Sequence, residues 1–577
     1  MNYKKSKFET YDFNSDSLDD IRLSEKGTRW PVVYYIKDDK EIYIGETVDA
    51  FNRTRTHLNS KDKNRVKLRE ITIISNDLFN KSATLDIESN LIEYLNADNE
   101  YKIQNLNKGI SGHNYYQRST YNQLLQDIWE QLKKEGVAHR DIKELANTDL
   151  FKYSPYKTLT PDQYSVTYEM IEEISKAINN NENRTIIVNG GAGTGKTVLA
   201  IYLMKLLSDS SKKLIKTIDT DGELDIDNQS LNSLENITSK LIVPQTSLRT
   251  TLGNVFKEIT GLKKNMVIGA SKIVPKYPEI VDGQIPNDKK EVTVAIVDEA
   301  HRLRQNVNVS GFQGGTFKEN NRRLGLENGT ELDWIVMNSQ IQILFYDETQ
   351  TIKPTDITPQ QFKHTIKHNK QSRYLLDSQM RVKGGNRYIK YINSILEEKE
   401  PEKEIFNDYD IKLFDNVDAM INAIKDKDKI HSLSRTVAGY AWKWNTSGKT
   451  QNEIINHELF DIEIDGSKYV WNSTAEDWVN SPNAINEIGS IHTIQGYDLN
   501  FVGVIFGEEI TYNPKTQKIE VIKDNYKDAY GKNTIEDIEE LKAYIINIYK
   551  VFMTRGILCT YVYVCDDNLR EYLRKYL

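Results

Sequence analysis

Residues 184–199, RTIIVNGGAGTGKTVL, decide the fold of this chain. The apolar run at residues 186–188 indicates a buried strand, and the glycine-rich turn after it leads into a helical run. The turn follows the pattern G-x-x-x-x-G-K-[ST], whose fixed positions are Gly190, Gly195, Lys196 and Thr197. The order of strand, glycine loop and helix is typical of a nucleotide-binding α/β domain.

The chemistry of this loop points to a nucleoside triphosphate. Glycines let backbone N–H groups approach a phosphate chain closely, and the positive end of the following helix faces the same phosphates. We expect Lys196 to reach the β- and γ-phosphates and the Thr197 hydroxyl to hold Mg²⁺. The predicted phosphate-binding residues are Gly190, Gly191, Ala192, Gly193, Thr194, Gly195, Lys196 and Thr197.

Two further apolar runs, VTVAIV at 292–297 and IQILFY at 341–346, read as strands buried in a parallel sheet. The first ends at Asp298 and Glu299. Asp298 is predicted to meet Mg²⁺ through water, and Glu299 to polarise the water that attacks the γ-phosphate. Two carboxylates at a strand tip beside a phosphate loop therefore predict nucleotide hydrolysis.

Composition limits the classes of protein that remain. A length of 577 residues allows about three or four domains. The net charge of −8 gives no global attraction to nucleic acid, so such binding would need local basic surface. Two cysteines cannot build a disulfide framework or a four-cysteine zinc site. The polar start lacks a signal-peptide core and no apolar run could span a bilayer, so we expect a cytoplasmic setting.

The first hundred residues predict a second small α/β unit. Strand candidates at 31–36 (PVVYYI) and 41–45 (EIYIG) flank a charged turn and read as a β-hairpin. Asp49 is a plausible N-cap for a helix that carries Arg53 and His57 one turn apart. Residues 85–95 have helical apolar spacing and include Glu88.

In this order and spacing, these residues resemble the GIY-YIG nuclease domain over about residues 30–112. Tyr34 matches the tyrosine of the first tripeptide, and residues 43–45 match the second tripeptide intact. Arg53, His57 and Glu88 stand where the family keeps its arginine, histidine and metal-binding carboxylate, and Asn105 matches its late asparagine. The sequence departs from the family at Val32 and Val33, which replace glycine and isoleucine.

The resemblance implies a metal-dependent phosphodiesterase. Glu88 would hold Mg²⁺ or Mn²⁺, and Arg53 would stabilise the charge that develops on the phosphate. Tyr34, with Tyr43 or His57, would handle the proton. A nucleic-acid backbone could follow the basic run Arg53, Arg55, Lys61, Lys63, Arg65, Lys67 and Arg69. A domain that only binds nucleic acid is the alternative.

Residues 155–577 resemble a superfamily 1 helicase motor built from two RecA-like lobes. In detail they look closest to Schlafen-like helicase-related ATPases, on PQTSLR (244–249), DEAH (298–301), SRTVAGYAWKW (434–444) and HTIQGYDLN (492–500). Gln163 lies in the segment that resembles the Q motif, where it would read the adenine edge and favour ATP over GTP. Short stretches between the motifs leave little room for large accessory domains, which favours translocation or sensing over processive unwinding.

The remaining motor motifs supply further site residues by the same resemblance. Asp347 and Gln350 would sense the γ-phosphate, and Arg381, with Gln379 in the same motif, and Arg555 would stabilise transition-state charge as arginine fingers. Coupling of nucleotide to nucleic acid would use His492, Thr493, Gln495 and Gly496. Trp442 and Trp444 could stack on bases, although core packing is the alternative for one of them.

The sequence thus predicts an α/β protein divided into a polar lead-in (1–30), a GIY-YIG-like domain (31–115), a helical linker that spaces it from the motor (116–155), lobe 1 (156–372) and lobe 2 (373–577). Residues 302–333 are glycine-rich and basic and are expected to form a mobile loop.

The predicted function is a nucleic-acid-dependent ATPase fused to an endonuclease that cuts DNA in bacterial defence against phage or foreign DNA. The cofactors are ATP and Mg²⁺, with Mn²⁺ as the other metal for the nuclease site. The alternatives are a repair or recombination enzyme and an ATP-switched nucleic-acid sensor. DNA is favoured over RNA as the partner, and a homo-oligomer or a partner subunit is compatible with one nuclease site per chain.

Overall fold

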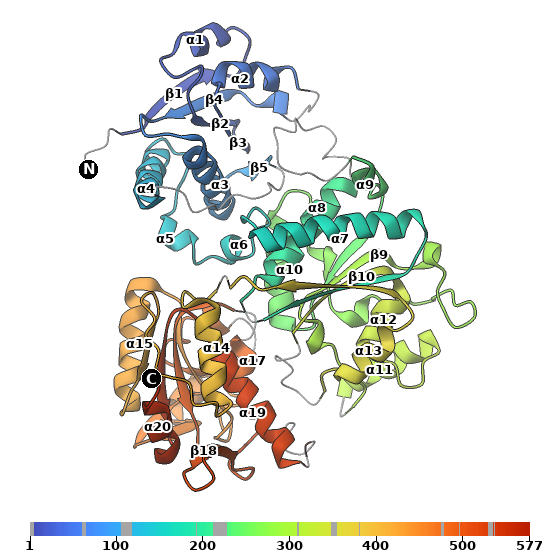
Figure 1. Ribbon diagram of the computed structural model, residues 1–577, viewed down its shortest axis with the longest axis vertical. Helices are drawn as coiled ribbons and strands as arrows, with labels where there is room; N and C mark the ends of the chain where they lie inside the picture. Colours follow the sequence, from blue (N-terminus) through green and yellow to red (C-terminus); the bar gives the residue numbers. More distant parts are fainter. Residues whose placement is uncertain are drawn as a thin grey trace.

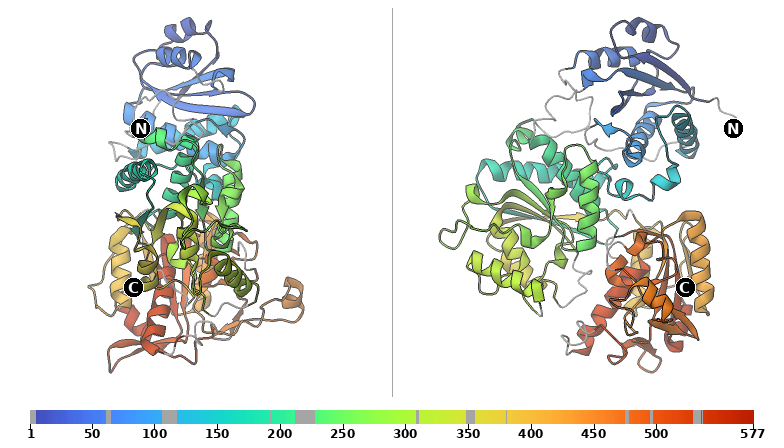
Figure 2. Two further views of the ribbon diagram at one scale, coloured as in Figure 1. Left: turned by 90° about the vertical axis from the view of Figure 1, so that its right-hand side faces the viewer. Right: turned by 180° about the vertical axis from the view of Figure 1, so that it is seen from behind.

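A computed structural model describes residues 5–60, 65–105, 118–191, 193–211, 228–307, 311–347, 355–379, 381–474, 478–494, 497–528, 535 and 537–577. Figure 1 shows an N-terminal domain in blue, a first motor lobe in green and yellow, and a second lobe in orange and red. In the side and rear views of Figure 2 the N-terminal domain lies at one end of the long axis and the second lobe at the other. Each part is built on its own sheet, so the predicted α/β class is confirmed.

The N-terminal sheet has the strand order β1-β4-β2-β3-β5. The predicted hairpin is confirmed as β2 (Val32–Lys37) and β3 (Glu41–Thr47), which pair antiparallel. Side chains of β2 alternate between two hydrophobic clusters, one on each face of the sheet. Helix α2 (Ala50–Leu58) begins as predicted after Asp49, whose carboxylate accepts from the Asn52 N–H. Helix α3 (Lys81–Asp98) contains the predicted helical stretch.

The expected loose lead-in is instead structured. Strand β1 (Lys7–Asp12) pairs antiparallel with β4 (Glu70–Ser75) along its whole length. Helix α1 (Leu18–Leu23) follows, with Ile21 fully buried. An edge strand is held mainly by backbone hydrogen bonds and needs only one covered face. The polar sequence KFETYD can therefore form a strand, although its composition does not predict one.

The expected linker helix belongs to the N-terminal domain. Helix α4 (Arg118–Lys134) contributes to the same core as α3, through Tyr121, Leu124, Leu125, Ile128, Trp129 and Leu132. Two short helices follow, α5 (Ile142–Leu145) and α6 (Asp149–Lys152). We call residues 139–158 the connector, because they join this domain to the motor.

Lobe 1 contains a six-stranded parallel sheet of order β11-β6-β10-β9-β7-β8. The predicted strands are present as β6 (Arg184–Gly190), β9 (Val292–Val297) and β10 (Ser339–Tyr346). The others are β7 (Ser239–Ile242), β8 (Val267–Ile268) and β11 (Lys370–Leu376). The predicted boundary between residues 372 and 373 cuts through β11, so lobe 1 extends at least to Leu376.

Helices cover both faces of this sheet, and the principal ones are α7 (Pro161–Asn179), α8 (Lys196–Ser211), α10 (Thr246–Glu258), α11 (Gly311–Leu324), α12 (Glu331–Asn338) and α13 (Pro359–Ile366). The expected mobile loop at 302–333 therefore contains helices instead. Aromatic packing explains why this segment is ordered into helices, because the ring of Phe317 lies 4.6 Å from the ring of the buried Trp334. The Trp334 indole N–H also donates to Asn321 Oδ1 at 2.6 Å.

Lobe 2 has a parallel sheet of order β12-β20-β17-β13-β16. Its strands are β12 (Asp410–Leu413), β13 (Ser434–Ala438), β16 (Ile488–Gly489), β17 (Leu499–Phe506) and β20 (Gly556–Val564). Its helices include α14 (Gly385–Leu396), α15 (Val417–His431), α17 (Ile491–Ile494), α19 (Ile538–Met553) and α20 (Asp567–Arg574).

The smaller elements are β5 (Lys102–Ile103), α9 (Asn228–Ser233), α16 (Gln451–Asn456), and the two hairpins β14 (Ile462–Ile464) with β15 (Ser467–Tyr469) and β18 (Ile510–Asn513) with β19 (Lys518–Val521). Within the described ranges, no helix combines the length and apolar character that crossing a bilayer requires.

Candidate functional site

The predicted phosphate loop connects β6 to α8. Gly193 and Gly195 have φ values of +82° and +78°, a region that glycine adopts at no steric cost. A Cβ on Gly193 would lie 2.1 Å from Gln379 Oε1, so only glycine fits there without a shift of that side chain. The Lys196 ammonium group lies inside the loop and donates to the carbonyl oxygens of Gly190 at 2.7 Å and Gly191 at 2.9 Å.

The parallel sheet brings the two predicted magnesium ligands together. The Thr197 hydroxyl, at the start of α8, donates to Asp298 Oδ2, at the end of β9, at 2.8 Å. Burial, and then the charge of Glu299, raise the pKa of Asp298 to about 7. A hydroxyl and a carboxylate are ligands that Mg²⁺ uses beside phosphate oxygens, so this pair fits the expected ion, and the ion would favour the ionised form of Asp298.

Glu299 directly follows this pair and has a left-handed backbone, with φ +53°. Its Oε2 lies 2.8 Å from Nε2 of His301, which is fully buried. Burial raises the pKa of Glu299, but His301 and Lys196 outweigh that effect, so the net shift is downward and the side chain is a carboxylate. A strained, ionised residue beside the loop suits the predicted orientation of a water molecule.

Both predicted arginine fingers reach the same cleft from the other side. A cleft of about 240 Å³ is lined by Lys196, Thr197 and Glu299 from lobe 1, together with Arg381, Asp498 and Arg555. The Arg381 guanidinium donates to the carboxylate of Asp498. Arg555 is 2% exposed, and burial lowers its pKa to about 10, so it stays charged at neutral pH.

Gln163 is placed differently from the expectation that it reads adenine. Its side chain is fully buried at the start of α7. Its Oε1 accepts from the Thr160 N–H, and its Nε2 donates to the Thr194 carbonyl, both at 3.0 Å. Gln163 therefore stabilises the phosphate loop through a hydrogen bond to its backbone. It is not among the described residues that line the cleft.

The other predicted residues of the motor site either lie outside the described residues or make the following contacts. Ala192, Gln350, Gln495 and Gly496 lie outside the described residues. Asp347 Oδ2 lies 3.7 Å from the Lys196 ammonium group, at the edge of the phosphate loop. The ring of His492 packs 5.6 Å from Tyr440, and Thr493 donates to the Ser490 carbonyl at 3.0 Å.

The two tryptophans predicted to stack on bases differ in exposure. Trp442 packs edge-on against Trp471, with ring centroids 6.5 Å apart, which is the core-packing alternative. Trp444 is 43% exposed and stays available for stacking.

The N-terminal candidates form a cluster on β2, β3, α2 and α3. The Tyr34 hydroxyl lies 2.8 Å from His57 Nε2 and accepts from Arg53 Nε at 3.1 Å. The ring of Tyr43 lies 5.1 Å from His57. Glu88 is 1% exposed. Burial is the main cause of the raised pKa of Tyr34, and the charge of Glu88 also raises that pKa. All five predicted side chains therefore meet in one place.

Two further residues shape the cluster. A Cβ on Gly45 would lie 2.4 Å from the Tyr34 ring, so the glycine of the second tripeptide is a packing requirement. Asn105 is 3% exposed and pairs with the backbone of Ile44, accepting from its N–H at 3.0 Å and donating to its carbonyl at 2.7 Å. The first contact packs β3 against β2, and the second ties residue 105 to the other edge of β3.

Arg65 is a member of this cluster that sequence reasoning missed. It was expected on an exposed basic track, yet it is 4% exposed. Its Nη1 lies 3.2 Å from His57 Nδ1, and its guanidinium carbon lies 3.3 Å from the centre of the Tyr43 ring. The run of alternating basic residues carries no periodic signal that separates Arg65 from its exposed neighbours.

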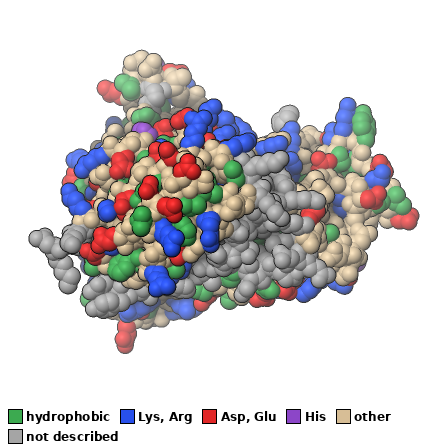
Figure 3. All heavy atoms as spheres, turned by 90° about the horizontal axis from the view of Figure 1, so that it is seen from above, with side chains coloured by type: hydrophobic (Ala, Val, Ile, Leu, Met, Phe, Trp, Pro, Cys, Tyr) green, Lys and Arg blue, Asp and Glu red, His purple; other side chains and the backbone are tan. Residues whose placement is uncertain are grey.

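The rest of the expected basic track is only partly described. Lys61 and Lys63 lie outside the described residues, while Arg55, Lys67 and Arg69 are exposed. Figure 3 shows acidic side chains interspersed with basic ones on the face seen from above. Over the described ranges, no group of three or more His, Cys, Asp or Glu side chains could hold a metal.

Comparisons with known proteins match the motor. A family model described as Schlafen group 3, DNA/RNA helicase domain, matches residues 183–566. The Saccharomyces cerevisiae protein YPL245W is 26% identical over 419 residues, which cover 67% of this chain and 83% of that protein. Among solved structures, the Candida albicans Pif1 helicase shares 13% identity over 72% of this chain and 96% of its own, with a TM-score of 0.27. An arterivirus nonstructural protein 10 helicase in complex with DNA shares 11% identity over 70% and 65% of the two chains, with a TM-score of 0.25.

Proposed function

Because this chain belongs to the Schlafen group 3 DNA/RNA helicase domain family, we propose that it is a motor that hydrolyses ATP when it engages nucleic acid. The observation that carries this proposal is the cleft in which lobe 1 presents Lys196, Thr197 and Glu299 while Arg381 and Arg555 face them. A lysine, a hydroxyl, a carboxylate and two arginines, the kinds of group that phosphoryl transfer uses, thus converge from segments up to more than 300 residues apart.

Each residue has a definite role in this mechanism. Lys196 leaves the carbonyl oxygens of the loop to bind the β- and γ-phosphates, and Glu299 orients the attacking water. Arg555 and Arg381 stabilise the charge that develops on the γ-phosphate. Mg²⁺ held by Thr197 and Asp298 would supply further neutralisation of the phosphates. Since the arginines lie across the cleft, closure of the lobes completes the site.

We also propose that the N-terminal domain is a metal-dependent endonuclease that resembles the GIY-YIG family. Support comes from the convergence of buried Tyr34, Tyr43, His57 and Glu88 with half-buried Arg53, although their chain positions span 54 residues. Arg53 would bind the scissile phosphate, and the Tyr34 hydroxyl would move the proton. A metal at Glu88 would supply neutralisation of the phosphate, with Mg²⁺ or Mn²⁺ as the candidates.

The motor is tested by ATP hydrolysis with and without single-stranded DNA or RNA. We expect stimulation by nucleic acid, and a loss of at least about 100-fold for Lys196→Ala. The control is Lys257→Ala, whose side chain is 71% exposed on α10. Hydrolysis by Lys196→Ala at the wild-type rate would disprove the assignment of this cleft.

The nuclease is tested by plasmid cleavage with Mg²⁺ or Mn²⁺, with and without ATP. Glu88→Gln should not cut but should retain ATP hydrolysis, and the exposed Glu100→Gln should behave as wild type. If wild type cuts no DNA or RNA while still hydrolysing ATP, the ATP-switched sensor replaces the nuclease as the better reading.

For the biological role we propose defence against phage or foreign DNA, since a motor and a cutting domain in one chain suit the destruction of a long polymer. Host repair or recombination uses the same chemistry and is the second candidate. A plaque assay with wild type and Glu88→Gln distinguishes them, because only a defence nuclease lowers phage yield in an otherwise intact host.

A further inference from the structure

The connector forms part of the wall of the nucleotide cleft. Besides the motor residues already described, the cleft is lined by connector residues Ala146, Asn147, Phe151, Lys152, Tyr153 and Lys157. These residues precede the motor in the sequence and follow directly on the N-terminal domain. The cleft therefore has three contributors, namely the two lobes and the segment that leads out of the N-terminal domain.

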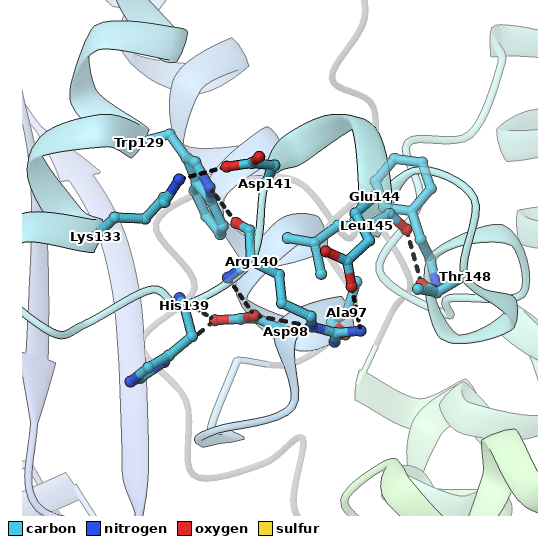
Figure 4. Close-up of polar contacts among 11 residues, drawn as sticks. Ala97, Asp98, Trp129, Lys133, His139, Arg140, Asp141, Glu144, Leu145 and Thr148 are labelled. Carbon is cyan, nitrogen blue, oxygen red and sulfur yellow. Dashed lines mark hydrogen bonds and ion pairs between the residues drawn. The ribbon is translucent and has the colours of Figure 1, made fainter. Parts of the chain in front are cut away.

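Buried polar contacts hold the start of the connector to the N-terminal domain, as Figure 4 shows. Asp98, at the end of α3, is 1% exposed in its side chain and accepts from the backbone N–H groups of His139 at 2.8 Å and Arg140 at 3.2 Å. The Arg140 side chain also bonds to Asp98, and the Trp129 indole donates to the Arg140 carbonyl at 3.0 Å. The connector thus leaves the domain in a fixed direction.

Helix α3 touches the connector again beside the cleft. The ring of Phe151 stacks on Tyr94, with centroids 5.0 Å apart and planes 15° apart. Glu93 accepts from the Thr158 N–H at 3.3 Å, and Ser89 bonds to the Thr158 hydroxyl at 3.0 Å. The helix that carries Glu88 therefore packs directly on a residue that lines the nucleotide cleft.

The connector also bonds to lobe 2. Asn500 Nδ2 donates to Asn147 Oδ1 at 3.0 Å, and the Lys152 ammonium group donates to the Asp498 carbonyl at 3.4 Å. Asp498 is the residue that holds Arg381. Lys152 thus lies next to the arginines that are expected to meet the γ-phosphate.

The positive charge of the side chains that line the cleft favours the binding of a polyanion. Five cationic side chains line it, Lys152, Lys157, Lys196, Arg381 and Arg555, against the two carboxylates of Glu299 and Asp498. Within the described ranges, neither connector lysine has a carboxylate within 4.0 Å. Burial lowers the pKa of Lys152; the charges of Asp498 and Asp149 oppose this shift, while those of Lys157 and Arg435 add to it. Phosphate groups in the cleft would relieve this repulsion.

We propose that Lys152 and Lys157 bind the phosphates of the nucleotide, so that the connector completes the ATP site and couples it to α3 of the N-terminal domain. This inference rests on the proposed ATP-binding function of the cleft. The physical route is short. The ligand fixes the two lysines; Lys152 is the chain neighbour of Phe151, and the Lys157 ammonium group lies 4.6 Å from the centre of the Phe151 ring, which stacks on Tyr94.

The first test measures the affinity of the full chain for a fluorescent ATP analogue, mant-ATP, with Mg²⁺. Lys152→Ala and Lys157→Ala should each raise Kd about tenfold, the effect of one charge-assisted hydrogen bond, and the double variant more. Lys152→Arg should retain affinity, because it keeps the charge. Lys143→Ala is the matched control, since Lys143 is an exposed lysine of the same connector.

The second test measures hydrogen exchange in residues 89–98 of α3 with and without unlabelled ATP and Mg²⁺. Wild type should gain protection there, and Tyr94→Ala, which removes the stacking partner of Phe151 outside the cleft, should bind mant-ATP but lose that response. The inference is overturned if the double lysine variant binds mant-ATP as wild type does while Lys196→Ala does not bind. If wild type itself does not bind mant-ATP, the proposed function of the cleft fails, and the inference fails with it.

Discussion

Arg65 and His57 form a buried pair in which Nη1 of the arginine lies 3.2 Å from Nδ1 of the imidazole. An arginine only donates hydrogen bonds, so Nδ1 must be the accepting, unprotonated nitrogen. The proton of the neutral ring is then on Nε2, which lies 2.8 Å from the Tyr34 hydroxyl. The Tyr34 oxygen therefore accepts from both His57 and Arg53, so its own O–H can act as a donor at the site.

This pair predicts a pH dependence of stability. Burial, then the charges of Arg65 and Arg53, lower the pKa of His57 to about 2, against about 6.5 in an unfolded chain. The unfolded state therefore binds the extra proton between these values, so stability is full above pH 6.5 and falls as the pH drops below it. The loss is at most about 1.4 kcal/mol per pH unit for one such group.

The measurement is hydrogen exchange of strand β2 at pH 7 and pH 5, corrected for the intrinsic exchange rate. Wild type should lose more protection than His57→Gln between the two values. Equal losses in the two proteins would mean that His57 is not held neutral by the fold.

The Thr197 hydroxyl should be essential for metal-dependent hydrolysis but not for folding. Thr197→Val removes a magnesium ligand and leaves Asp298 without its 2.8 Å donor, at a cost of about 1–3 kcal/mol in stability. We expect ATP hydrolysis to fall at least about 100-fold, with a higher Mg²⁺ concentration needed for half-maximal rate. Thr197→Ser keeps the hydroxyl and serves as the control. Unchanged Mg²⁺ dependence in the valine variant would place the ion elsewhere.

Substitution of Gln163 should weaken the binding of different nucleotides equally. Because its amide bonds to Thr160 and Thr194, Gln163→Ala loosens the phosphate loop, and the Kd values for ATP and GTP analogues should rise together, roughly tenfold. Competition of ATP and GTP against mant-ATP gives both values. A selective loss of ATP affinity would instead restore the expectation that Gln163 reads the adenine edge.

Asp98 should matter more for the connector than its exposed neighbour Asp141. Asp98→Ala leaves the N–H groups of His139 and Arg140 without an acceptor and should cost about 1–3 kcal/mol. Asp141 is 68% exposed and pairs with Lys133 on the surface, so Asp141→Ala should cost at most about 1 kcal/mol. Urea denaturation of both variants measures the difference. Equal costs would show that the buried bonds do not hold the connector.

Local sequence patterns alone predict the elements that carry the motor site. The phosphate loop, the strand ending at Asp298 and the helix capped by Asp49 follow from short-range rules, because φ preferences, capping hydrogen bonds and apolar runs act over a few residues. The order of the motifs over residues 155–577 also predicted a Schlafen-like helicase family, and the family model confirms it over residues 183–566.

Which polar residues are buried, and what they contact, depends on the tertiary fold. The sequence predicts Arg65 to be one basic residue of an exposed run, Gln163 to contact the adenine base, and the connector to be a spacer. Each was placed by contacts with residues far along the chain, such as Gln163 with Thr194 and Lys152 with Asp498. The energy of a buried charge or amide depends on the partners that packing brings within hydrogen-bond reach, and no local pattern encodes those partners.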